Sequence, residues 1–458
     1  MTAGTTARPT AGVPRPYRFP EFERRQIPGG VELITAPVSK LPLVSIVALI
    51  DAGATRDPAG REGLAVLTAK LLLEGTSKRD GAALVDAFEQ LGATVDVSAG
   101  WDAAAVQLTV LRGNVEAALT LLSEVLREAA FGERDVARLK AERQAERMQM
   151  RTEPRELADE SFEHFLYAPE SRYSRAAAGT TQSIAVVARE DLLAFYRAQY
   201  VPDRLTVIMV GDIEHEQGAV MAAAAFAGWT GTAADTPAVS EQPAARTRRV
   251  QIVAKTDAPQ SELRIGHLGL PRNHPDHFNL VVMNALLGGL FSSRINLNLR
   301  ERHGYAYSAR SGFEWRRGTG PFVVSTAVES GVTADATREI VVEIEGMRKA
   351  PIGQEELTLA TSYLAGVFPI WYETTAAIAG ALAALVTYDY PPDYFDTYRQ
   401  HIGAVTAEDV LRVAQQHLHP DQLLVVAVGD PSVVEPPLLR LELGPVAVAS
   451  PDEVEPGP

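Results

Sequence analysis

An internal repeat constrains the fold of this chain more than any other feature of its sequence. Residues 187–212 recur without a gap as residues 405–430, at a constant offset of 218 positions, because 408 − 190 and 429 − 211 both give 218. Each copy predicts a helix that an acidic pair opens, then a Pro-Asp turn, then an apolar strand that ends at Gly-Asp. Ungapped agreement over this length indicates a tandem duplication, so we expect two halves of similar structure.

Strands and helices are expected in both halves. Alternating apolar residues predict the strands, and apolar residues at helical spacing predict the helices. The expected strands cover residues 31–37, 43–50, 105–112, 250–254 and 262–270, and the expected helices include residues 115–129 and 134–152. Clustered hairpins mixed with helices favour an α+β fold for each half over a doubly wound parallel sheet.

The composition divides the chain into five parts. With 458 residues it exceeds the size of one ordinary core, and a segment rich in Pro, Ala, Thr and Ser marks a linker near its middle. The expected parts are a flexible N-terminal tail (1–22), a first α+β domain (23–229), the linker (230–249), a second α+β domain (250–434) and an acidic, Pro-rich tail (435–458).

Composition also excludes several classes of function. The chain has no cysteine, which excludes thiol catalysis and cysteine-ligated zinc, and its net charge of −15 argues against nucleic acid as the main partner. The apolar run over residues 376–386 is too short to cross a bilayer, so we expect a buried helix and no membrane partner. The first twenty residues lack the apolar core of a signal peptide, which favours a cytoplasmic protein and leaves a periplasmic one open.

Residues 288–308 join a glycine pair, a helix and an aromatic stretch. The helix is expected to stop near Gly304, because glycine readily adopts the left-handed conformation that ends a helix. Aromatic residues then predict a strand over residues 305–308. Arg300 on the last helical turn and Tyr307 on this strand therefore converge across one tight turn. That arrangement suits binding of a peptide carbonyl.

At these residues the chain resembles the second half of the pitrilysin/insulinase-type zinc peptidases, the inverted zincins, which include mitochondrial processing peptidases. In that family a glycine-rich turn precedes a helix, an Arg and, seven residues later, a Tyr, as Gly288, Gly289, Arg300 and Tyr307 do here (307 − 300 = 7). The resemblance covers residues 31–430. It implies that Arg300 and Tyr307 contact the substrate backbone and stabilise the transition state, and that the glycine pair touches substrate.

The same resemblance places the zinc of such peptidases in the first half. There the family has a Gly-Leu-Ala start, a helical His-x-x-Glu-His motif and a Gly-Thr end, and residues 63–76 keep this frame. Val66 and Lys70, however, stand at the two histidine positions, and Ala69 replaces the general base. Valine has no donor atom and a protonated lysine repels Zn²⁺. We therefore expect no metal ligands at these degenerate positions.

The remaining candidate ligands do not complete a metal site in the sequence. Glu146 matches the family's third ligand, but it is expected to pair with charged neighbours such as Arg143. An ion pair between Lys70 and Glu146 across the vanished site is a further hypothesis. His274 and His277 look like a histidine pair, yet a proline separates them, and we expect both on the surface.

The resemblance implies a non-catalytic subunit of a heterodimeric zinc peptidase. This chain would form a clamshell with a homologous zinc-bearing subunit and supply Arg300 and Tyr307 in trans, while binding no cofactor itself. A peptide would be the substrate. Two alternatives stay open: a structural or peptide-binding protein with no role in proteolysis, like the core subunits of respiratory complexes, and a self-sufficient peptidase.

Overall fold

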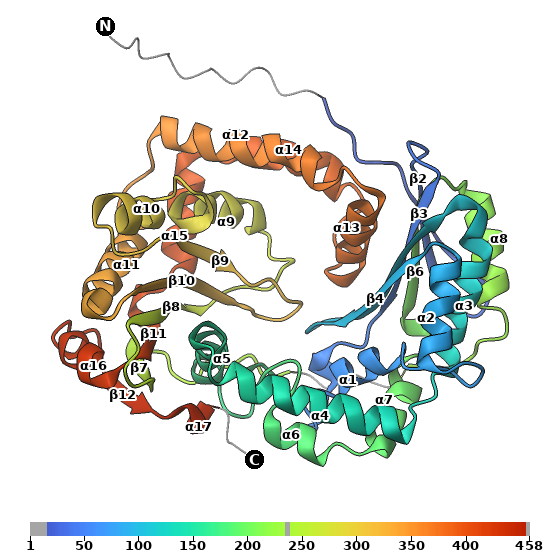
Figure 1. Ribbon diagram of the computed structural model, residues 1–458. Coiled ribbons are helices and arrows are strands. Elements are labelled where there is room, and N and C mark those ends of the chain that lie inside the picture. The colour runs from blue at the N-terminus through green and yellow to red at the C-terminus, as the bar shows by residue number, and fades with distance from the viewer. Residues whose placement is uncertain (1–15, 234–238, 455–458) are drawn as a thin grey trace, which may run out of the picture.

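The computed structural model describes residues 16–233 and 239–454 and consists of two α+β halves that lie side by side (Figure 1). Each half contains one six-stranded mixed sheet. The strand order of the second sheet repeats that of the first, apart from one edge strand. This agreement confirms the two-half fold that the repeat predicts.

The first sheet has the order β1-β2-β6-β3-β5-β4. Its strands are β1 (Glu23–Gln26), β2 (Glu32–Pro37), β3 (Leu43–Ile50), β4 (Thr94–Ala99), β5 (Ala104–Leu111) and β6 (Leu205–Gly211). Strand β6 runs parallel to β2 and antiparallel to β3, which makes the sheet mixed. All residues of β6 are buried, which explains why this strand is apolar in the sequence apart from Thr206.

The second sheet has the order β12-β7-β11-β8-β10-β9. Its strands are β7 (Arg249–Ala254), β8 (Gln260–Leu268), β9 (Ala309–Phe313), β10 (Pro321–Glu329), β11 (Leu424–Gly429) and β12 (Val446–Ala449). Five of them take the places of β2 to β6. The edge strands differ, because β1 pairs antiparallel with β2, whereas β12 comes from the C-terminal end of the chain and pairs parallel with β7.

The prediction that the acidic, Pro-rich residues 435–458 form a tail outside the second domain is therefore wrong for the part that the structure describes. Residues 431–454 contain α16 (Pro431–Leu439), β12 and α17 (Pro451–Val454), and Val454 is buried. The physical reason is the free edge of β7, whose backbone hydrogen bonds β12 completes. Residues 455–458 lie outside the described part.

Helices cover the sheets. In the first half they are α1 (Leu64–Leu71), α2 (Gly81–Gln90), α3 (Val115–Glu128), α4 (Glu133–Met150), α5 (Pro154–Leu166), α6 (Thr181–Val186), α7 (Arg189–Gln199) and α8 (His215–Ala225). In the second half they are α9 (His277–Asn284), α10 (Arg294–Asn296), α11 (Thr333–Met347), α12 (Gln354–Trp371), α13 (Thr375–Thr387), α14 (Tyr394–Ala404) and α15 (Ala407–His417). Wider helical turns extend α9 over Ala285–Gly289 and α10 over Leu297–Arg302.

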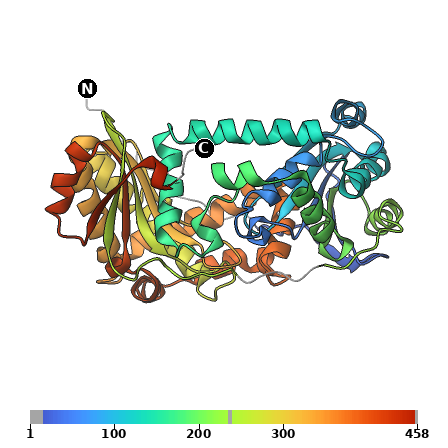
Figure 2. The ribbon, with the colours of Figure 1, turned by 90° about the horizontal axis from the view of Figure 1, so that it is seen from below.

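Each half gives one helix to the sheet of the other half. Helix α5 packs on β8 and β11 of the second sheet, whereas α13 packs on β3 and β6 of the first (Figure 1). Long α4 carries the chain from the first half towards α5 (Figure 2). The predicted boundaries at residues 229 and 250 therefore do not separate two independent cores. Helical periodicity shows which face of a helix is buried, not which sheet buries it.

The first described residues are also packed. Of the predicted flexible tail over residues 1–22, residues 1–15 lie outside the described part. Phe19 is buried, and its ring stacks on Phe395 at 4.3 Å and meets Tyr372 edge-on at 5.5 Å. The expectation of a loose tail is thus wrong for residues 16–22, because an aromatic side chain anchors them to the second half.

The predicted linker over residues 230–249 is bound to the protein in its second part. The amide of Ala168 donates to Gln242 O at 2.9 Å, and that of Ala244 donates to Leu166 O at 2.9 Å. Residues 234–238 lie outside the described part. These hydrogen bonds tie the chain that enters the second half to the end of α5.

A buried arginine joins the two halves. Arg316 follows β9 in the second half, and its guanidinium forms ion pairs with Glu163 of α5 and, at 3.1 Å, with Glu314. The same guanidinium lies 4.6 Å from the Trp101 ring and 4.8 Å from the Tyr173 ring, both supplied by the first half. Burial of this cation among first-half side chains fixes the two halves relative to each other.

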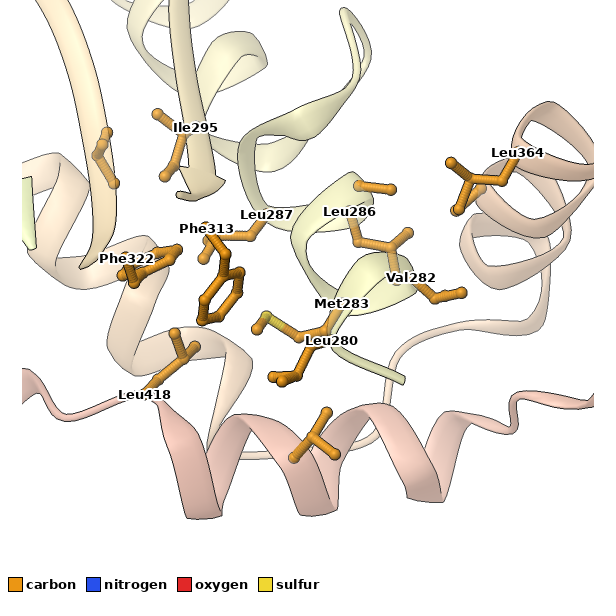
Figure 3. Close-up of a cluster of buried hydrophobic side chains, with 14 of the residues drawn as sticks. Leu280, Val282, Met283, Leu286, Leu287, Ile295, Phe313, Phe322, Leu364 and Leu418 are labelled. Carbon is orange, nitrogen blue, oxygen red and sulfur yellow. The ribbon is translucent and has the colours of Figure 1, made fainter. Parts of the chain in front are cut away.

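The second core is built around the segment that precedes the candidate site. Leu280, Met283 and Leu287 project from α9 and its extension towards Phe313 of β9 and Phe322 of β10 (Figure 3). The helical stretch over residues 277–302 is long and apolar enough to cross a membrane. These buried leucines identify it instead as a core helix of the second half.

Candidate functional site

Arg300 and Tyr307 meet at the turn where the α10 extension ends. Gly304 has the left-handed conformation with φ +67°, which reverses the chain. The Arg300 Cζ atom then lies 5.4 Å from the Tyr307 ring and 4.6 Å from the Phe291 ring. The predicted convergence of Arg300 and Tyr307 is confirmed. Phe291 was not predicted, because nothing in the local pattern distinguishes it from an ordinary apolar residue.

The predicted strand over residues 305–308 is wrong. The amide of Tyr305 donates to Leu299 O at 2.8 Å and so still closes the helical turn. Strand β9 begins only at Ala309, whose amide donates to Asn296 Oδ1 at 3.0 Å. Tyr307 consequently lies on an irregular segment before the sheet, and 87% of its surface is exposed.

The two aromatic rings orient the Arg300 guanidinium. It forms cation–π contacts with Phe291 and Tyr307, and Glu301 Oε1 lies 3.4 Å from its Nε. The N–H groups at its edge and the Tyr307 hydroxyl are hydrogen-bond donors. Two adjacent donors of this kind can bind a carbonyl oxygen and stabilise negative charge that develops on it.

The glycine pair occupies two different environments. Gly288 is buried against β9, and a Cβ atom there would lie 2.5 Å from the Ser311 amide nitrogen. Close approach of the helix to the strand therefore explains Gly288, and its burial does not support the predicted contact with substrate. Gly289 is exposed, and contact with substrate stays a prediction for this residue.

We expect Gly288→Ala to lower the free energy of unfolding by about 1–3 kcal/mol, because backbone atoms must move to admit the methyl group. Thermal denaturation of the purified chain measures the effect. Gly366→Ala is the matched control, since a Cβ atom at this exposed α12 position meets nothing within 4 Å. That variant should be more stable by about 0.5–1 kcal/mol. Equal melting temperatures for the two variants would contradict the packing explanation.

The degenerate zinc motif lies on α1 opposite α4. Ala69 is buried, Val66 is half-buried, and Lys70 extends towards α4. Lys70 Nζ lies 3.6 Å from Glu146 Oε1, which confirms the hypothesis of an ion pair across this position. Arg143 Nη1 also donates to Glu146 Oε2 at 2.7 Å, as predicted for a charged neighbour.

These residues do not fit a zinc ion. Among the degenerate motif positions and Glu146, only Glu146 has a carboxylate, and the ammonium group of Lys70 stands where a histidine nitrogen is required. Burial alone would raise the pKa of Glu146, but the Arg143 hydrogen bond and the Lys70 charge outweigh it and hold that pKa below its usual value. The carboxylate is thus neutralised by side chains of this chain.

A second cluster of potential ligands lies at the start of α9. Ligand atoms of His274, Asp276 and His417 lie within 4.8 Å of one another. Both Asp276 oxygens are already bound, one by Arg412 Nη2 at 2.7 Å and the other by His417 Nε2 at 2.8 Å. The Arg412 hydrogen bond above all holds the pKa of Asp276 well below its usual range. We interpret the cluster as an ion-pair network.

The prediction that His277 lies on the surface is wrong. Its ring is only 5% exposed and packs edge-on against Trp315 at 4.7 Å. Nδ1 has no hydrogen-bond partner within the described residues, and burial lowers the pKa of His277 to about 2. The side chain is therefore neutral in the folded protein.

Buried His277 makes stability depend on pH in a defined direction. The pKa of His277 in the folded protein lies below the unfolded value of about 6.5. Its contribution to the free energy of unfolding is therefore fully present above pH 6.5 and is lost as the pH falls below about 6.5. At pH 5 we expect a loss of about 2 kcal/mol relative to pH 7.5 from this histidine. Urea denaturation at the two pH values should show that His277→Phe reduces the difference. An undiminished difference would contradict a neutral His277.

Comparison with known proteins finds the same family in both halves. Residues 35–177 match the family described as Insulinase (Peptidase family M16), and residues 187–364 match the Peptidase M16 inactive domain. An uncharacterized zinc protease of Streptomyces coelicolor is 22% identical over 400 residues, which are 86% of this chain and 87% of that protein. A probable β subunit of the mitochondrial-processing peptidase of Arabidopsis thaliana is 23% identical over 423 residues, covering 90% of this chain and 78% of that protein.

A solved structure shares the arrangement of both halves. The crystal structure of a peptidase M16 inactive domain from Pseudomonas fluorescens superimposes with a TM-score of 0.83 and 26% identity. The match covers 89% of this chain and 98% of that one. The two-half architecture of this chain is therefore similar to that of the Pseudomonas fluorescens protein over nearly its whole length.

Proposed function

Because the chain belongs to peptidase family M16, we propose that it is the non-catalytic subunit of a heterodimeric zinc metallopeptidase. The observation that carries the proposal is the contrast between the two candidate sites. Tyr307 is exposed and lies beside the half-buried Arg300, whereas Lys70 and Glu146 form an ion pair at the position of the zinc motif. A homologous partner subunit with an intact His-x-x-Glu-His motif supplies the zinc and the general base.

In the proposed complex Arg300 and Tyr307 bind the substrate backbone. The guanidinium carbon lies 4.6 Å from the Phe291 ring and 5.4 Å from the Tyr307 ring, and these contacts favour one position of the guanidinium before a peptide arrives. Such preorganised donors stabilise the charge that develops on a carbonyl oxygen in the transition state. An extended peptide lying across this turn offers its carbonyl oxygens in regular order.

Zinc content and peptidase activity test this proposal. Both are measured for the purified chain alone and for a mixture with its His-x-x-Glu-His-bearing relative from the same genome. We expect neither zinc nor activity in the chain alone, and activity in a stable one-to-one complex. Stoichiometric zinc and cleavage by the chain alone would overturn the proposal. A stable complex without any peptidase activity would favour a structural or peptide-binding role instead.

A further inference from the structure

A polar cavity of about 420 Å³ opens beside Tyr307 on the face of the second sheet that α5 covers. Ser325 and Ala327 line it from β10, the strand between β8 and β9. Small side chains at these two positions leave space above the strand, because the residues on the neighbouring strands are much longer. The cavity is therefore a consequence of side-chain size within one sheet.

The register of the sheet places two arginines on either side of Ser325. Ser325 is the direct partner of Arg264 on β8 and of Arg310 on β9, so all three side chains lie on one face. Adjacent strands are about 4.8 Å apart, which puts the two arginine Cα atoms roughly 10 Å from each other. A side chain of a bound peptide can enter between them.

The arginines around this cavity differ in their partners. Arg264 is buried and holds both carboxylates of the cavity, Asp159 at 2.5 Å and Glu262 at 2.9 Å. Arg310 and, on α5, Arg155 are exposed and also line it. Neither of these two forms an ion pair with a carboxylate in residues 16–233 or 239–454. Two positive charges thus stay available to a ligand.

We propose that this cavity binds an acidic side chain of the peptide substrate, with Arg310 and Arg155 as its ligands. The inference rests on the proposed function, because Tyr307, which also lines the cavity, binds the substrate backbone there. A guanidinium binds a carboxylate through two parallel hydrogen bonds, which gives geometric selectivity as well as charge attraction. The substrate class is then peptides with Asp or Glu close to the bond that Arg300 and Tyr307 hold.

Three fluorescent peptides that differ only in carrying Glu, Gln or Lys at one position test the inference in the assembled complex. The position is chosen by scanning a neutral peptide with Glu. We expect kcat/KM to decrease in the order Glu, Gln, Lys, and Arg310→Gln to lower the Glu to Gln ratio by roughly fivefold, as for an exposed ion pair. Arg440→Gln, which removes an exposed arginine outside the cavity, should leave the ratio unchanged. A preference for Lys, or a ratio that Arg310→Gln does not change, would overturn the inference.

Binding to the chain alone separates this inference from the proposed function. Fluorescence anisotropy with the same peptides measures affinity without a partner or zinc. If the chain binds the Glu peptide preferentially, and Arg310→Gln and Arg155→Gln each weaken this binding, the result supports an acidic side chain in the cavity. That support holds even if the complex cleaves no peptide. If cleavage depends on Tyr307 but is equally fast for the Glu, Gln and Lys peptides, and if their affinities measured by anisotropy are equal, the inference about the cavity is overturned. The proposed function would then be retained.

Discussion

Tyr307→Phe is expected to lower kcat/KM of the proposed complex by about a hundredfold, the size of effect seen when one donor to a developing oxyanion is lost. The change removes a single hydroxyl group and keeps the aromatic ring, whose centre lies 5.4 Å from the guanidinium carbon of Arg300. Because Tyr307 is 87% exposed, the melting temperature of the chain should not change. Steady-state kinetics of the complex measures the effect, and the loss should fall mainly on kcat.

Two further variants show whether the hydroxyl acts on the reacting carbonyl. Arg300→Ala should lower kcat/KM at least as much, because it removes the second donor and the cation that positions the Tyr307 ring. Tyr305→Phe is the matched control, since Tyr305 stacks on His303 two residues away from Tyr307. Full activity of both Tyr307→Phe and Arg300→Ala in a complex that binds zinc would remove the proposed role of this pair.

Arg316→Met is expected to destabilise the protein by about 3–5 kcal/mol, because it leaves Glu163, whose side chain is only 18% exposed, without its cation. Burial raises the pKa of Glu163, and the positive charge of Arg316 opposes that rise. Loss of the guanidinium also removes its cation–π contacts with Trp101 and Tyr173. Chemical denaturation followed by tryptophan fluorescence measures the change.

A double variant distinguishes the unpaired charge from lost packing. Glu163→Gln combined with Arg316→Met removes both charges, so it should recover part of the stability that Arg316→Met loses. Arg440→Met removes an exposed arginine at the end of α16 and should have an effect within about 0.5 kcal/mol. A double variant less stable than Arg316→Met alone would contradict an unpaired Glu163 as the cause.

The parts of the site that are local in the sequence could be predicted from it. Arg300 and Tyr307 are separated by one helical turn and one left-handed glycine, so their convergence follows from backbone geometry. Lys70 and Glu146 are far apart in the sequence, and only the family resemblance identified them as neighbours. The repeat itself predicted the two halves because both copies encode the same helix, turn and strand.

The parts that depend on distant strands could not be predicted in the same way. Arg264, Arg310 and Ser325 lie side by side only because β8, β10 and β9 pair in a particular register. The edge strand β12 was missed because it is only four residues long and follows a Pro-rich segment. The free edge that it completes belongs to β7, which lies far from it in the sequence. Local propensity carries no information on either pairing.

The exchanged helices have a consequence for synthesis on the ribosome. The first sheet is complete when β6 ends at Gly211, but α13, which covers one of its faces, begins only at Thr375, 164 residues later (375 − 211). At about 5–20 residues per second the apolar face stays uncovered for roughly 8–30 s. During that interval the nascent chain offers chaperones, and other nascent chains, a binding surface that the finished protein no longer has.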